Sequence, residues 1–238
     1  MRFSDAIFSL KRLLFPAVCP ICGKSLIEAE PFLCIDCTLS APFTNMWQSR
    51  DNDMEQRFWG QIPIIRAAAL LWFVDGSNWR TLIHNFKYHN HWYYAENMGY
   101  LLATEFARSN FFEGIDLIVP VPLHWCRKLR RGYNQTEHIA AGISRYTSIP
   151  YCFNAVRRRV NNPPQVTTMY AERWDNSGDI FEVTKVKQLR GKHILLVDDV
   201  CTTGATLVSL AKTISRACDK DVKISVAAIA ASRHMMKI

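Results

Sequence analysis

The chain has 238 residues, a formal net charge of +8, and 49% hydrophobic against 21% charged residues. These values are ordinary for a soluble globular protein, and the length allows one large domain with a small appendage or two modest domains. The longest apolar stretch, residues 67–74, is far shorter than the roughly 18 residues that a membrane span needs. The composition therefore excludes a membrane-spanning protein. The positive charge favours an anionic partner, either the phosphates of a small substrate or nucleic acid.

The N-terminal segment, residues 1–15, has some features of a secretory signal but lacks others. Lys11 and Arg12 interrupt its apolar run, and no cleavage site with small residues follows. Its apolar side chains fall on one helical face. We therefore predict an amphipathic docking helix over residues 1–15 and a cytoplasmic protein.

Two Cys-x-x-Cys turns come next, Cys19 with Cys22 and Cys34 with Cys37, separated by eleven residues. A cytoplasmic chain argues against disulfides. Each turn presents two thiolates, and two turns complete a tetrahedral four-sulfur site, so we predict structural zinc. A redox pair and an iron–sulfur cluster are the alternatives. Gly23 suits a tight turn that needs a positive φ.

The chain divides into three parts by composition. Residues 1–45 are short, rich in cysteine and punctuated by proline, which is typical of a small zinc-ribbon-like module. Residues 46–61 are polar and are predicted to be a linker or loop. Residues 62–238 alternate between strand and helix patterns and form the predicted main domain.

The main domain is predicted to be an α/β fold. Strands are predicted at residues 66–74, 115–119, 179–183, 193–198 and 222–231, and helices at 79–88, 93–108, 137–146 and 206–217. Strand–helix alternation of this kind indicates a parallel sheet covered by helices on both faces. Active sites in such folds lie at the carboxyl ends of the strands.

The strongest chemical signal follows the apolar strand at residues 193–197. Asp198 and Asp199 come first, then a Thr/Gly turn at residues 202–206 that enters a helix. Backbone N–H groups of such a turn bind anions, and Gly204 permits close approach to them. Carboxylates repel phosphate but accept hydrogen bonds from ribose hydroxyls. The combination predicts a ribose 5-phosphate site, and it matches neither a P-loop nor a dinucleotide fingerprint.

Residues 195–206 resemble the phosphoribosyl pyrophosphate (PRPP) signature of type I phosphoribosyltransferases. Together with residues 119–124, residues 131–135 and the Cys-x-x-Cys pairs, they resemble the ComF/GntX-like family of competence-associated phosphoribosyltransferase-like proteins. The resemblance covers nearly the whole chain. It implies a type I phosphoribosyltransferase fold, which is a parallel sheet flanked by helices with an irregular hood, beside the small zinc module.

The same resemblance implies a pyrophosphate loop at residues 122–131, whose basic residues suit a polyanion. The alternative is a solvated basic loop. Asn134 is a candidate N-cap of the next helix. His124 is a candidate acid or base, or else a packing residue, and Lys87 matches a lysine of the family, or else lies at the surface. The predicted catalytic residues are Asp198 and Asp199, and the predicted substrate contacts are Lys87, His124, Arg131, Asn134, Gln135, Val200, Cys201, Thr202, Thr203, Gly204, Ala205 and Thr206.

The segment from residues 157–176 resembles the variable hood of the family. A loop of this kind closes over the substrate and excludes water. Arg159, Gln165 and Arg173 are weaker candidates for substrate contact within it.

Two functions follow from these patterns. The favoured one is a PRPP-binding enzyme in which an unknown acceptor displaces pyrophosphate from ribose C1 with the help of Mg²⁺. The alternative is a non-catalytic protein of the same fold that binds single-stranded DNA or a helicase partner during DNA uptake. DNA binding predicts a continuous basic surface from Lys128 to Arg157, interleaved with aromatic residues. The sequence carries no base-recognition motif, so it names no acceptor, and it predicts no oligomeric state.

Overall fold

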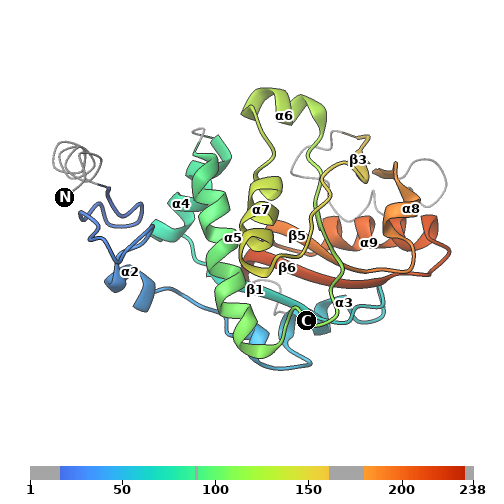
Figure 1. Ribbon diagram of the computed structural model, residues 1–238, viewed down its shortest axis with the longest axis horizontal. Helices are drawn as coiled ribbons and strands as arrows, with labels where there is room; N and C mark the ends of the chain where they lie inside the picture. Colours follow the sequence, from blue (N-terminus) through green and yellow to red (C-terminus); the bar gives the residue numbers. More distant parts are fainter. Residues whose placement is uncertain (1–16, 89–90, 161–179, 234–238) are drawn as a thin grey trace, which may run out of the picture.

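The computed structural model describes residues 17–88, 91–160 and 180–233 (Figure 1). The helix predicted over residues 1–15 lies outside the described residues, as do the hood candidates Gln165 and Arg173. No helix within the described part of the chain is long and apolar enough to cross a membrane.

A four-stranded parallel sheet forms the centre of the protein, in the order β1-β6-β5-β2. Its strands are β1 (Ala67–Phe73), β2 (Leu117–Pro120), β5 (His193–Cys201) and β6 (Lys223–Ser232). Val197 of β5 pairs with Ala227 of β6, and Ile118 of β2 pairs with Leu195 of β5. The parallel sheet predicted from strand–helix alternation is therefore confirmed, and β5 and β6 are its central strands.

Helices cover the sheet on both faces (Figure 1). The helices are α2 (Ile35–Leu39), α3 (Asp53–Phe58), α4 (Asn78–Tyr88), α5 (Trp92–Phe106), α6 (Trp125–Arg131), α7 (Gln135–Thr147), α8 (Val186–Leu189) and α9 (Ala205–Ala217), with short 3₁₀ helices η1 (Met46–Gln48) and η2 (Ala107–Ser109). Helices α5 and α7 pack against each other and against the sheet. Since α9 carries the chain from β5 back to β6, a right-handed crossover puts it on the opposite face.

Two glycines let α5 and α7 cross almost backbone to backbone. A Cβ on Gly99 would lie 2.1 Å from the carbonyl oxygen of Ile139, and one on Gly142 would lie 1.9 Å from that of Glu96. No larger residue fits either position without separating the helices. The crossing matters for function because α7 begins at the same end of the sheet where β5 ends.

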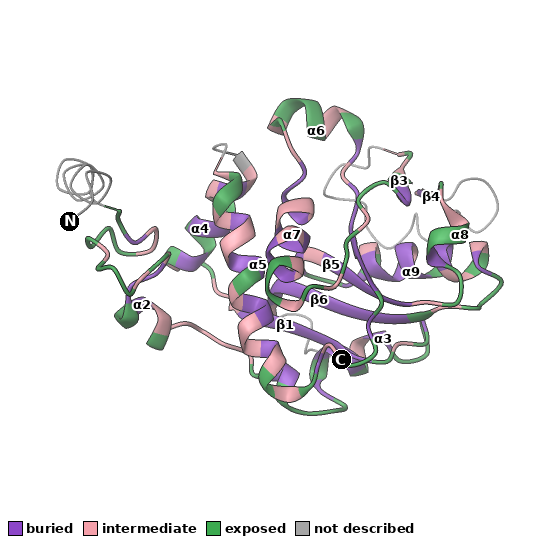
Figure 2. Ribbon diagram, in the orientation of Figure 1, coloured by how far each residue is buried: buried purple, intermediate pink, exposed green. Residues whose placement is uncertain are grey.

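The hood is a separate two-stranded antiparallel pair, β3 (Val156–Arg158) with β4 (Phe181–Val183). Figure 2 shows the sheet as the buried centre, whereas α6 is exposed along most of its length. Helix α6 lies in the segment predicted as a basic loop, so that segment is partly helical. Strand β5 extends beyond its predicted end at Asp198 to Cys201, so both aspartates belong to the strand.

Residues 46–61 differ from the polar linker predicted for them. They form η1 and α3, and the side chains of Trp47, Met54 and Phe58 are at most 1% exposed. Asn52 caps α3 and also donates from Nδ2 to the Ala67 carbonyl at 2.9 Å. Asn52 and Glu55, two polar residues of this segment, bond to the backbone of Ala67 at the start of the edge strand β1. The division of the chain at residues 45 and 61 stays a prediction, but residues 46–61 pack on the sheet.

Candidate functional site

The turn after β5 has the form that anion binding requires. Gly204 is the N-cap of α9 with a φ of +78°, which favours glycine. A Cβ there would also lie 3.0 Å from Cε1 of Phe58, a tight contact, so both the backbone conformation and the packing favour glycine. Thr202 and Thr203 are exposed, and Oγ1 of Thr203 accepts from the N–H of Ala205 at 3.4 Å. The first N–H groups of α9 have no acceptor within the helix and lie next in sequence to two exposed threonines, an arrangement suited to a phosphate.

Asp199 lies at the centre of a polar network. Its side chain is 9% exposed, and its Oδ1 lies 3.0 Å from Nζ of Lys87 at the end of α4. Its Oδ2 accepts from Nε2 of Gln135, in the first turn of α7, at 2.5 Å. Gln135 in turn accepts from Nη1 of Arg131 at 3.0 Å. Four of the predicted site residues are thus brought together, and both carboxylate oxygens of Asp199 have partners.

Asp198 has a different environment, because successive side chains of a strand point to opposite faces. It is half-buried, and its Oδ1 accepts from the N–H of Asp199 at 2.8 Å. Burial, and then the charge of Asp199, raise the pKa of Asp198, while the charges of Lys87 and Arg158 act in the opposite direction. A ligand that donates hydrogen bonds or carries a cation would relieve this repulsion. Asp198 is therefore the acid better placed to meet a ligand.

Arg158 is a site residue that the sequence analysis missed. Burial and the charge of Arg127 lower the pKa of Arg158, while the charge of Asp198 opposes them, so this hood residue lies within electrostatic range of Asp198. Its guanidinium stacks on the ring of Phe181, 5.6 Å from the centroid. The predicted candidate, Arg159, instead lies 3.5 Å from Glu182. Successive side chains of an extended segment point to opposite sides, so Arg158 and Arg159 have different neighbours. Recognising residues 156–158 as a strand would have pointed to Arg158.

His124 and Asn134 both cap helices beside the site. Nδ1 of His124 accepts from the N–H of Cys126 at 3.3 Å, which makes it the N-cap of α6. Asn134 caps α7, as predicted, and its Nδ2 donates to the Val121 carbonyl at 3.2 Å. Through this bond Asn134, which is only 2% exposed, joins α7 to the loop that follows β2. The proposed acid or base role of His124 and the substrate contact of Asn134 stay predictions.

Comparison with known proteins agrees with this geometry. Residues 126–237 match the phosphoribosyl transferase domain family. Competence protein F of Haemophilus influenzae is 29% identical over 147 residues, which is 60% of this chain and 64% of that protein. The DNA utilization protein YhgH of Escherichia coli (strain K12) is 26% identical over 202 residues, 84% of each chain. These relatives and the matched domain support a likeness of the chain to ComF-like proteins. The alignment thus spans somewhat less than two thirds of competence protein F, but most of YhgH.

Among solved structures, a glutamine PRPP amidotransferase from B. subtilis is 20% identical, with a TM-score of 0.38. That match covers 56% of this chain and 25% of the other. The fold follows instead from the matched domain and from the chain's own sheet topology.

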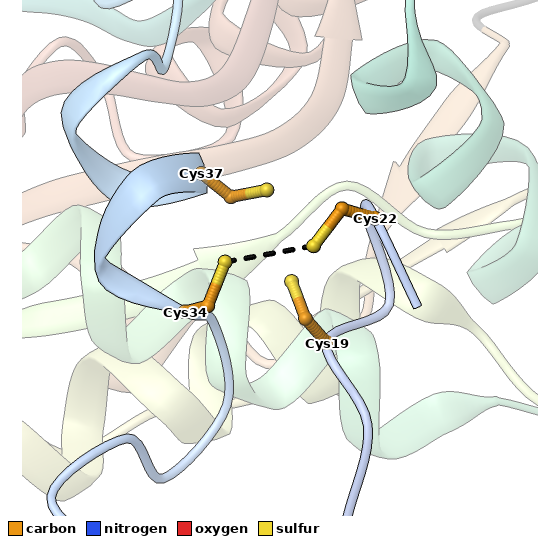
Figure 3. A group of neighbouring side chains, drawn as sticks. All are labelled: Cys19, Cys22, Cys34 and Cys37. Atoms are coloured by element: carbon orange, nitrogen blue, oxygen red, sulfur yellow. Dashed lines mark hydrogen bonds between the residues drawn. The ribbon is translucent and has the colours of Figure 1, made fainter. Parts of the chain in front are cut away.

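The four cysteines near the N-terminus, Cys19, Cys22, Cys34 and Cys37, converge at one point (Figure 3). Their sulfur atoms all lie within 4.8 Å of one another, and those of Cys22 and Cys34 are 3.6 Å apart. Four thiolates around one tetrahedral ion with bonds of about 2.3 Å would stand about 3.8 Å apart, so the cluster fits a single metal ion such as zinc. Gly23 has the predicted positive φ, +74°, and Lys24 pairs with Asp36 at 2.7 Å to join the two turns.

Proposed function

We propose that this protein binds PRPP, or another ribose 5-phosphate compound, at the carboxyl end of β5. The turn at residues 202–206 would hold the 5′-phosphate, and Asp198 would accept hydrogen bonds from the ribose hydroxyls. One observation carries the proposal: an anion-binding turn and an acidic pair adjoin each other at the edge of the sheet where Lys87, Gln135 and Arg131 converge. The cations suit the pyrophosphate, and the acids suit the ribose.

The reaction that this arrangement favours is displacement at ribose C1. The bond from C1 to pyrophosphate breaks, a bond to an acceptor forms, and pyrophosphate leaves. The transition state is oxocarbenium-like, so nearby carboxylates stabilise it and cations stabilise the leaving group. Mg²⁺ bound to the substrate would neutralise the pyrophosphate, and Asp198 is the carboxylate that could assist in holding it. Asp199, with both oxygens engaged, acts as a positioning residue for Lys87 and Gln135.

Calorimetry with PRPP and Mg²⁺ tests the binding step. We expect the wild type to bind, and the double variant Asp198→Asn/Asp199→Asn to lose about tenfold or more in affinity, as hydrogen bonds to charged groups are lost. Absence of binding by the wild type would exclude the proposal. Pyrophosphate release from PRPP across a panel of bases and ammonia then tests transfer. Binding without release under any acceptor would leave a ligand-binding protein and contradict the enzyme.

The proposal includes a structural Zn²⁺ held by Cys19, Cys22, Cys34 and Cys37. The compact four-sulfur cluster supports it, because a closed four-ligand site leaves no open position for catalysis. A multi-iron cluster would hold its thiolates farther apart. The cytoplasmic location predicted from the sequence belongs to the same proposal and agrees with reduced cysteines.

A second candidate function is binding of single-stranded DNA or a DNA-uptake partner. The names of two relatives concern competence and DNA utilization. Helix α6 supports this candidate, because it exposes Trp125 by 64% and Leu129 by 74% among basic residues. Exposed aromatics beside cations stack with unpaired bases. Electrophoretic mobility shifts with single-stranded DNA over a salt series test it, since binding through phosphates weakens with salt, and absent or salt-insensitive binding contradicts it.

A further inference from the structure

The phosphate-binding turn rests on helix α3, which is remote from it in sequence. Phe58, fully buried at the end of α3, lies directly beneath Gly204. The preceding residue, Arg57, donates from Nε to the carbonyl oxygen of Thr203 at 3.3 Å. Arg57 and Thr203 are 146 residues apart in the chain. The turn at residues 202–206 therefore contacts α3, which is not part of the Thr/Gly motif.

Arg57 brings a full positive charge to this turn. Burial, and then the charge of Asp198, raise the pKa of the Cys201 thiol, and the positive charge of Arg57 acts against them. The guanidinium carries five N–H donors, and the bond to Thr203 uses one of them. Within the described part of the chain, its two terminal nitrogens make no hydrogen bond or ion pair. Residues 202–206 contain no lysine or arginine, so Arg57 supplies charge that the turn itself lacks.

The position of Arg57 is held from the other end of α3. Asn52 caps this helix by accepting from the N–H groups of Met54 and Glu55. Glu55 also accepts from the N–H of Ala67 at 3.2 Å and pairs with Arg66 at 3.4 Å. Both Glu55 and Arg66 are buried, so α3 is fastened to β1. Arg57 therefore reaches the turn from a rigid element.

We propose that Arg57 is a further phosphate-binding residue, whose terminal nitrogens contact the phosphate monoester held by residues 202–206. The inference rests on the proposed function. It adds to that site a phosphate ligand from outside the matched domain at residues 126–237. Arginine suits this position because its planar fork donates two parallel hydrogen bonds to one phosphate.

An arginine that only supported the turn would make the same bond to the Thr203 carbonyl. The chain offers a control for this alternative. Arg50 lies in the same segment and also donates to a backbone carbonyl, from Nη1 to Ile65 at 3.0 Å. Its partner, Ile65, lies just before β1 and not in the turn at residues 202–206. Arg50→Gln therefore removes a comparable backbone contact and the same charge, but no phosphate contact.

Calorimetry with three ligands on the full-length protein tests the inference: ribose 5-phosphate, PRPP with Mg²⁺, and pyrophosphate alone. For Arg57→Gln we expect about tenfold or greater loss of affinity for ribose 5-phosphate and PRPP, the size typical of a lost hydrogen bond to a charged group. Pyrophosphate affinity should be unchanged, since its cations lie elsewhere. Arg57→Lys, which keeps the charge without the fork, should show an intermediate loss, and Arg50→Gln should behave like the wild type.

Two results would overturn the inference alone: wild-type affinity for ribose 5-phosphate in Arg57→Gln, or an equal loss for pyrophosphate accompanied by a lower melting temperature. The second would mean that Arg57 only supports the turn. Failure of the wild type to bind any of the three ligands would instead overturn the proposed function, and the inference with it.

Discussion

The α5–α7 crossing provides a sharp test of the structure. Gly142→Ala adds one methyl group where the helices touch, 1.9 Å from the Glu96 carbonyl oxygen and 2.8 Å from the Tyr100 nitrogen. Both neighbours are backbone atoms of α5, so no side chain can rotate away. Reaching even the 3.0 Å limit of real Cβ contacts requires about 1.1 Å of separation between the helices.

The magnitude follows from two opposing effects. Replacing glycine by alanine within a helix favours folding by about 1 kcal/mol. Overpacking a well-packed core costs about 1–3 kcal/mol, and contact with two backbones puts this site at or above the upper end. We expect a net loss of about 2 kcal/mol, which lowers the melting temperature by about 4–8 °C in a protein of this size.

The same separation would disturb the site. Gln135 begins α7 and donates to Asp199 at 2.5 Å, so a shift of the helix by about 1 Å lengthens that bond beyond hydrogen-bonding range. Thermal unfolding by circular dichroism and PRPP calorimetry measure the two effects. The control is Ser144→Ala, a small change on α7 away from the crossing, expected within about 0.5 kcal/mol of the wild type. An unchanged or raised melting temperature in Gly142→Ala would show that the helices do not cross this closely.

Three further predictions concern charge and metal. Lys87→Ala leaves Asp199 without its cation, so we expect a stability loss of about 2 kcal/mol in urea unfolding, less than for a fully buried pair because Lys87 is 20% exposed. The control is Arg80→Ala, which breaks the exposed pair with Asp75 and should cost at most about 0.5 kcal/mol. Equal losses in the two variants would contradict the buried network. The raised pKa of Asp198 means that the folded state binds a proton more tightly than the unfolded state, so this group's contribution to stability is present at low pH and declines as pH rises from the unfolded pKa through the folded one. Asp198→Asn should therefore gain stability relative to the wild type as pH increases, and parallel melting curves against pH for the two proteins would refute the raised pKa. Metal analysis after purification without chelators should find about one zinc per chain, whose removal lowers the melting temperature, whereas less than about half an equivalent would contradict the four-sulfur site.

Local patterns were enough to predict several structural features of the candidate site. Gly204 and Asn134 act through their own backbone position and the helix that follows, so the residue types alone indicate a turn and a cap. The apolar run at residues 193–197 predicts a buried central strand for the same reason. The spacing of the four cysteines likewise predicted the sulfur cluster that the structure contains. These features follow from residue types and from short spacings along the chain.

The sequence by itself therefore determined the four strands of the parallel sheet, helices α4, α5, α7 and α9, and the acid-and-turn motif, whereas tertiary structure decided which distant residues complete the site. Asp199 meets Lys87 only because the tertiary fold brings the end of α4 to the carboxyl end of β5. Arg158 lies within electrostatic range of Asp198, whereas the neighbouring Arg159 pairs with Glu182. Arg57 reaches Thr203 across 146 residues because buried polar groups fasten α3 to β1. Such contacts depend on how the whole sheet and its helices pack. A buried polar side chain needs a hydrogen-bonding partner, and that partner can be distant in sequence, where no local pattern specifies it.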